Sequence, residues 1–146
     1  ADTWGPHVWT LFHTLAEKVN EDQFRVVSVK LFGFIKRICS LLPCPECQEH
    51  AKRYLSMIKP VIDTKQQLKQ FLFTFHNHVN THKRKLIQTD EILTTYSDAK
   101  LATVYNSFIT SFTARGNNRL LADTLHRNRL LQEFRKWLLE HARYFY

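Results

Sequence analysis

The stretch Leu42-Pro43-Cys44-Pro45-Glu46-Cys47 divides one predicted helix from the next. Pro43 is expected to end the first helix, because a proline disfavours helical backbone in the residue before it. Pro45 suits the first position of the following helix, where its missing N–H costs nothing. Cys44 then takes the N-cap and Cys47 lies within the first turn. The stretch therefore predicts a short connection between two helices, with both cysteines at a helix start.

Helices are predicted on both sides of this connection, because apolar residues recur at helical spacing while glycine and proline are rare. Thr64 and Gln67 fit a capping box at the start of one of these helices. No convincing strand and no repeat is found, so an all-α fold is expected, a bundle with its site between helices. The predicted helices cover residues 6–20, 23–42 and 44–57, one beginning near residue 64, one at 90–112, and one from about 119 to the end.

The last two predicted helices are expected to form an antiparallel pair, because the break Gly116-Asn117-Asn118 is short enough for a helical hairpin. Such a pair would extend the core. It would also change the surface through which the chain could form a dimer, and it would leave a basic outer face to which an acidic protein substrate could bind. The apolar face of the last helix is expected to comprise Leu121, Leu125, Leu131, Phe134, Leu138, Ala142 and Phe145.

Composition limits the function classes only partly. The 146 residues suit about one domain. The 21 basic and 13 acidic residues give a net charge of +8, which is compatible with nucleic acid, an anionic membrane surface or an acidic partner. No run of 18 apolar residues is present, so no membrane span is expected, and no signal peptide is visible at the start.

The three cysteines are Cys39, Cys44 and Cys47, too few for a secreted disulfide scaffold. The C-x-x-C spacing of the last two indicates redox or metal chemistry. A helix N-terminus favours negative charge and so lowers a thiol pKa. The thiolate is the nucleophile and leaving group of disulfide exchange, which makes Cys44 and Cys47 candidate catalytic residues. Cys39, inside the preceding helix, is expected to be a buried, inert thiol.

A second group of residues suggests an electron carrier, which a dithiol needs to reduce oxygen efficiently. Trp9 and His13 are four residues apart on one helix face, and so are His76 and Asn80 on another. The two faces could enclose a planar heterocycle with polar edges, through ring stacking and hydrogen bonds.

The segments W-G-x-x-x-W-x-x-F-H at 4–13, P-C-P-E-C at 43–47 and H-N-H-V-N at 76–80 together resemble the Erv/ALR family of FAD-linked sulfhydryl oxidases. The compact arrangement is most similar to members encoded by large DNA viruses. The resemblance covers residues 4–97 and implies a four-helix bundle holding FAD, here a core of residues 1–97 extended by C-terminal helices at 98–146. Residues 98–146 match nothing in the family, and Lys83 stands where relatives usually carry leucine.

The resemblance also implies the roles of individual residues. Cys47 would lie against the flavin and Cys44 would face the substrate. The implied FAD-binding residues are Gly5, Trp9, His13, His76, Asn77, Val79, Asn80, Lys85 and Tyr96.

The implied activity is oxidation of protein dithiols, with electrons passing through FAD to oxygen to give hydrogen peroxide, usually in a homodimer. No second cysteine pair is present to act as a shuttle, so a client would attack Cys44 directly or through a thioredoxin-like carrier. The sequence leaves the compartment unknown. A viral source would imply host cytoplasm, viral assembly sites or the virion.

Two alternative functions, neither of them enzymatic, were also weighed against the sequence. A structural zinc module could use Cys44, Cys47, His78 and His82, although the gap between the cysteines and histidines is far longer than in a zinc finger. A nucleic-acid-binding module is suggested by charge alone, without a dense basic face or a helix-turn-helix spacing. Neither alternative explains Trp9, His13 and Asn80.

Overall fold

The computed structural model describes residues 4–114 and 121–145, and every element named in these ranges is a helix. The α-helices are α1 (Trp4–Lys18), α2 (Phe24–Ser40), α3 (Pro45–Ile58), α4 (Lys65–His82), α5 (Leu101–Phe112) and α6 (Leu121–Glu140). Two 3-10 helices, η1 (Asp90–Asp98) and η3 (Ala142–Tyr144), complete the elements. The prediction of an all-α fold is confirmed. Among the described residues, no helix is long and apolar enough to cross a membrane.

Both helix starts that carry a local sequence signal form as predicted. Cys44 is the N-cap of α3, with Pro45 in the first position and the Cys44 sulfur accepting a hydrogen bond from the Cys47 N–H at 3.2 Å. Thr64 caps α4, where its hydroxyl accepts from the Gln67 N–H and the Gln67 side chain accepts in return from the Thr64 N–H. These side chains satisfy amides that the helix itself leaves without partners.

The predicted helix at 90–112 is wrong in its first half. Residues 90–98 form the 3-10 helix η1, extended backbone follows at Ala99, and α5 begins only at Leu101. The hydroxyls of Thr94, Thr95 and Ser97 each donate to the carbonyl three residues earlier. Such local bonds compete with regular helix, and η1 buries none of its residues to compensate.

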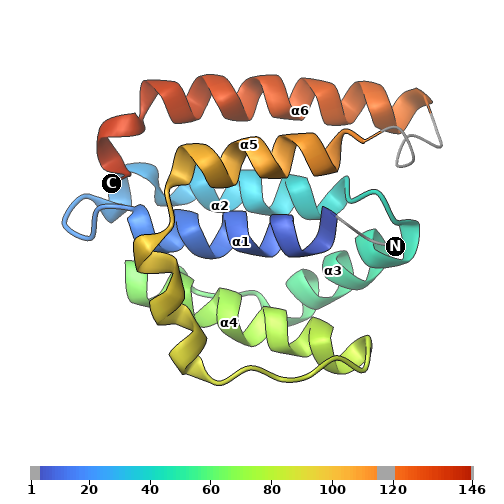
Figure 1. Cartoon of the computed structure of the whole chain (residues 1–146), viewed down its shortest axis with the longest axis horizontal. Helices are drawn as coiled ribbons and strands as arrows, with labels where there is room; N and C mark the ends of the chain where they lie inside the picture. The colour runs from blue at the N-terminus through green and yellow to red at the C-terminus, as the bar shows by residue number, and fades with distance from the viewer. Residues whose placement is uncertain (1–3, 115–120, 146) are drawn as a thin grey trace.

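Helix α1 lies at the centre of the bundle (Figure 1). It packs on α5 on one side and on α4 and η1 on the other, while α2 packs on α3 and α6. The core is rich in aromatic side chains with almost no exposed surface, among them Phe12, Phe75, Phe108, Phe112 and Phe134. Burying such large apolar side chains is the main favourable contribution to folding.

Helices α5 and α6 run antiparallel on the side of α1 and α2 opposite α4, as Figure 1 shows. The Tyr105 and Phe134 rings join them, with centroids 6.0 Å apart. The predicted antiparallel pair is therefore confirmed, although each helix packs mainly on a core helix, α5 on α1 and α6 on α2. The break at Gly116–Asn118, on which that prediction relied, lies outside the described residues.

The predicted apolar face of α6 is only partly correct. Leu131 and Phe134 are buried and Leu138 is half-buried, as expected, but Leu125 is exposed. The helix was also predicted to reach the end of the chain, whereas α6 ends at Glu140, and the exposed Ala142 and buried Phe145 lie beyond it, in and after η3. Phe134 lies nine positions after Leu125, which at 100° per residue places the two side chains on opposite sides of the helix. The buried side also includes Arg127, Leu130 and Trp137. Nothing is described for the side chain of Leu121.

Candidate active site

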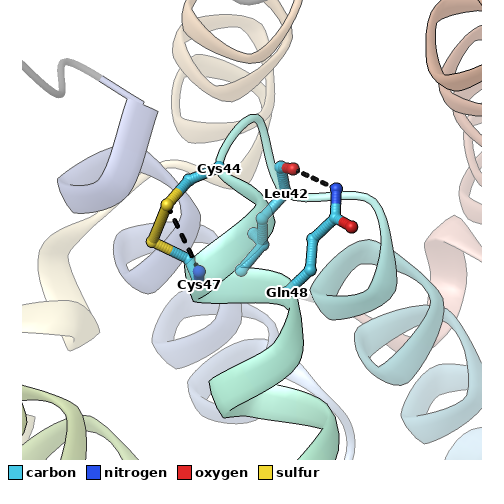
Figure 2. The surroundings of a disulfide bond; sticks show 4 residues. All are labelled: Leu42, Cys44, Cys47 and Gln48. Atoms are coloured by element: carbon cyan, nitrogen blue, oxygen red, sulfur yellow. Dashed lines mark hydrogen bonds between the residues drawn. A yellow bond between two sulfur atoms is a disulfide. The ribbon is translucent and has the colours of Figure 1, made fainter. Parts of the chain in front are cut away.

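A disulfide between Cys44 and Cys47 occupies the first turn of α3 (Figure 2). The connection from α2 is held in place next to it, because the side-chain amide of Gln48 donates to the Leu42 carbonyl at 2.6 Å. The prolines on either side of Cys44 thus have the structural effect that the sequence predicted. They end one helix and start the next with the cysteine pair between them.

A cavity of about 860 Å³ adjoins the disulfide and is bounded by α1, the start of α3, the second half of α4 and the segment that follows α4. Cys47 lines this cavity and Cys44 does not. The two cysteines therefore differ in environment, although only two residues separate them. Seven of the nine predicted cofactor-binding residues line the same cavity: Gly5, Trp9, His76, Val79, Asn80, Lys85 and Tyr96.

Trp9 and His76 form one wall of the cavity. Their rings are nearly parallel, with centroids 4.2 Å apart, and Phe75 packs edge-on against Trp9. In this structure the Trp9 and His76 rings contact each other directly, so a planar group would lie beside the pair and not between the two rings. The pair instead presents a continuous surface, next to which a planar group has space.

His13 lies behind this wall and not on the cavity surface. One ring nitrogen of His13 shares a hydrogen bond with His76 across 3.0 Å, and Tyr96 stacks on the His13 ring at 4.8 Å. Burial and then the neighbouring His76 lower the pKa of His13 to about 3. Burial and then Lys85 lower the pKa of His76 to about 4. Both imidazoles are therefore neutral at neutral pH, so the N–H of one ring can donate a hydrogen bond to the bare nitrogen of the other.

Asn77 does not line the cavity. Its side chain donates to the Gln88 carbonyl at 2.8 Å and accepts from the Gln88 N–H at 2.9 Å. Through this pair of bonds Asn77 fixes the segment that follows α4. The structure thus gives Asn77 an anchoring contact, whereas the resemblance implied a contact with the cofactor.

Basic residues reach the cavity because α4 ends in a tight turn. Arg84 has a left-handed backbone (φ 59°), its N–H donates to Thr81, and the Lys85 N–H donates to the Asn80 carbonyl at 2.7 Å. This pattern is the Schellman termination of a helix. Lys83, Arg84 and Lys85 all line the cavity, so the turn concentrates positive charge at one end of it.

A stack of histidines lies beside the disulfide. The His50 ring is 4.1 Å from His82 and 5.1 Å from His78. Within residues 4–114 and 121–145, no group of three or more histidine, cysteine or acidic side chains is arranged to hold a metal ion. The zinc alternative therefore has no geometric support.

Several cavity residues were missed from the sequence. Trp4 is buried, lines the cavity, and has the Lys83 ammonium 5.7 Å from its ring centre. It belonged to the W-G-x-x-x-W motif, which was the available signal. Cys39 also lines the cavity, and as predicted it is a buried, free thiol, whose pKa burial raises to about 12.

Gly5, a predicted site residue, lines the cavity with open space beside it, since an added Cβ would meet no atom within 4 Å.

The Erv1/Alr family model matches residues 6–115. The chain belongs to the Erv1/Alr family. The match continues past residue 97 and includes α5, which corrects the prediction that nothing after that residue resembles the family. The predicted division at 97 stays a prediction.

Similar proteins come from large DNA viruses, as predicted. Protein 096R of Invertebrate iridescent virus 3, provisionally named an FAD-linked sulfhydryl oxidase, is 37% identical over 84 residues, 56% of this chain and 57% of the relative. The FAD-linked sulfhydryl oxidase of African swine fever virus is 26% identical over 102 residues, 69% of this chain and 86% of the relative. The chain thus spans little more than half of the first relative. No solved structure is significantly similar to it. The predicted enzyme class and FAD cofactor agree with the names of these relatives.

Proposed function

We propose that this Erv1/Alr-family protein is an FAD-dependent thiol oxidase that makes disulfides in protein substrates through Cys44 and Cys47. The observation that carries the proposal is the position of the disulfide, at a helix N-terminus with Cys47 on the wall of the cavity. An inert structural disulfide would need neither feature. The family and the names of the relatives support the same activity.

The residues around the cavity suit FAD. The cavity has a volume of about 860 Å³, which is within the range of cofactor sites. Trp4 and the Trp9–His76 wall offer aromatic surface for planar rings, and Lys83 and Lys85 offer positive charge for the pyrophosphate. The buried Nδ1 of His13 has no hydrogen-bond partner within the described part of the chain, which leaves one polar atom behind the cavity wall for a water to satisfy.

The protein's own chemistry is thiol–disulfide exchange. A client thiolate attacks the Cys44 sulfur, the Cys44–Cys47 bond breaks, and Cys47 leaves as a thiolate. A second client thiolate then attacks the mixed disulfide at the client sulfur, which releases the client disulfide and leaves Cys44 and Cys47 reduced. FAD, when bound, supplies a two-electron acceptor for this dithiol and a route to oxygen, which becomes hydrogen peroxide.

The two cysteines would divide this work by their environment. Cys44, away from the cavity, receives the client, whereas Cys47, on the cavity wall, delivers electrons to the cofactor. We further propose a homodimer and a protein dithiol or thioredoxin-like carrier as the client. Both follow from the family resemblance, and gel filtration with light scattering tests the first.

The purified protein tests the proposal directly. We expect a yellow protein with a flavin absorption spectrum that consumes oxygen and produces peroxide when given a dithiol. Cys47→Ser should stop oxygen consumption and keep the colour. Ser40→Ala, at an exposed position outside the cavity, is the control and should retain activity. A colourless protein without added-FAD binding would contradict the proposal.

A further inference from the structure

The connection that carries the cysteine pair is held by a residue far away in the sequence. Arg127 of α6 donates from Nε to the Leu41 carbonyl at 2.9 Å. Leu41 is the C-cap of α2 and lies three residues before Cys44. The next carbonyl, that of Leu42, accepts from Gln48 of α3. Two successive carbonyls before Pro43 are thus held by side chains, one from α6 and one from α3 (Figure 2 shows the second).

The surroundings of Arg127 mark this contact as specific. The side chain is only 2% exposed, in a helix whose other arginines are at the surface. Its guanidinium lies 5.4 Å from the centre of the Phe112 ring of α5. A buried guanidinium is costly unless its donors are used, and the last carbonyls of a helix need donors and favour positive charge. The Nε–H of Arg127 and the Leu41 carbonyl therefore satisfy each other.

Helix α6 is fixed on α2 by further contacts on the same side. Phe34 packs against Phe134 and Trp137, at 5.1 and 5.4 Å between ring centres. Arg37 of α2 pairs with Glu133 of α6 at 2.7 Å. Because these contacts at residues 133–137 hold α6 on α2, Arg127 of the same helix is a fixed donor and can fix the backbone that it contacts.

We propose that Arg127 is a positioning residue for the redox pair, through which α6 holds the α2–α3 connection so that Cys44 stays at the N-cap of α3 and Cys47 at the cavity. The proposal rests on the proposed function. It gives α6, which lies beyond the family match at 6–115, a part in the reaction without contact to substrate or cofactor. Electron flow from a dithiol through Cys44 and Cys47 should depend on Arg127, and steps that bypass the cysteines should not.

The test uses two ways of reducing the bound flavin without oxygen. Dithiothreitol acts through the Cys44–Cys47 disulfide, whereas dithionite reduces flavin directly. Arg127→Met keeps the apolar stem and removes the donor. We expect at least a roughly 10-fold lower rate at saturating dithiothreitol, because small displacements of reacting groups are costly. The dithionite rate, the flavin absorbance and reoxidation by oxygen should be unchanged. Arg129→Met, at an exposed arginine of the same helix, should behave like the wild type.

Arg127→Lys restores one donor without the planar fork and should recover part of the rate. A wild-type dithiothreitol rate in Arg127→Met, or equal slowing with dithionite, would overturn the proposal. If Arg127→Met does not fold, Arg127→Lys decides: slowing with dithiothreitol alone supports positioning, and a wild-type rate overturns it.

Amide hydrogen exchange on FAD-free protein separates this proposal from the proposed function. In Arg127→Met we expect faster exchange confined to residues 41–48, and unchanged exchange there would overturn the anchor. If the wild type never passes electrons from dithiothreitol to flavin, the proposed function fails, while the exchange experiment still decides whether Arg127 holds the connection.

Discussion

Cys44 and Cys47 are separated by only two residues, yet only Cys47 lines the cavity. If Cys47 is the partner of the flavin, Cys44→Ser should leave the Cys47 thiolate next to the ring and produce a long-wavelength absorption band, whereas Cys47→Ser should not. Both variants should be inactive with protein dithiols. Visible spectra across a pH series check this, and a band in Cys47→Ser alone would reverse the two roles.

The His13–His76 pair predicts how stability depends on pH. In the unfolded chain both imidazoles bind protons as pH falls through about 6.5. In the folded protein the two imidazoles stay unprotonated until the pH is close to their lowered pKa values, about 3 for His13 and about 4 for His76. Protonation therefore favours unfolding, and the contribution to stability that is complete above pH 6.5 is lost between 6.5 and about 3.

His13 alone can contribute a slope of up to about 1.4 kcal/mol per pH unit in this window. We expect the free energy of unfolding to fall below pH 6.5 and the fall to be smaller in His13→Asn. Urea unfolding at several pH values measures the slope. An equal slope in wild type and His13→Asn would show that the pair has no such effect.

At the scale of single elements, the two ends of α4 have different roles, one in stability and one in the cavity. The Thr64 capping box stabilises the start, whereas His76, Asn80 and the turn at Arg84 form the cavity wall. Thr64→Ala should therefore lower the free energy of unfolding by about 1 kcal/mol without weakening FAD binding. Thr74→Ala, at an exposed position inside the same helix, should cost less. Thermal unfolding and FAD titration measure the two effects, and weaker FAD binding in Thr64→Ala would argue against the separation.

What the sequence predicted well rests on local signals. Pro43, Pro45 and the Thr64–Gln67 pair act within a few residues, and each set the helix boundary expected of it. The helix break near Ala99 was missed because it depends on hydroxyl–carbonyl bonds and on the lack of burial in η1, which periodicity does not report. Arg127 was missed because its partner, Leu41, is 86 residues away.

The site was predicted in a similar way. Motifs placed Trp9, His76, Asn80 and Cys47 around one cavity, because helical spacing fixes which side chains share a face. Spacing could not predict the contact of Trp9 with His76, which depends on how closely α1 and α4 pack.

At the scale of the whole molecule, α6 covers one side of α2. Deleting residues 114–146 should leave FAD bound, because no described residue of α6 lines the cavity. It should also expose Phe34 and its neighbours, which now pack on Phe134 and Trp137. Light scattering should then show a changed oligomeric state or aggregation. Leu139→Ser, which alters an already exposed position on α6, should not. A soluble truncated protein with the assembly of the full chain would contradict this role.

The central place of α1 sets how the cavity can open. Leu11 and Leu15 are fully buried, and α1 is covered by α4 and α5, so its amides should exchange with solvent only on global unfolding. The opposite boundary, residues 84–96, buries none of its side chains and should open far more often. The cavity thus has one boundary, α1, that should stay closed, and an opposite one, residues 84–96, that should open. The rate at which FAD dissociates should follow the opening of residues 84–96, while α1 remains closed throughout.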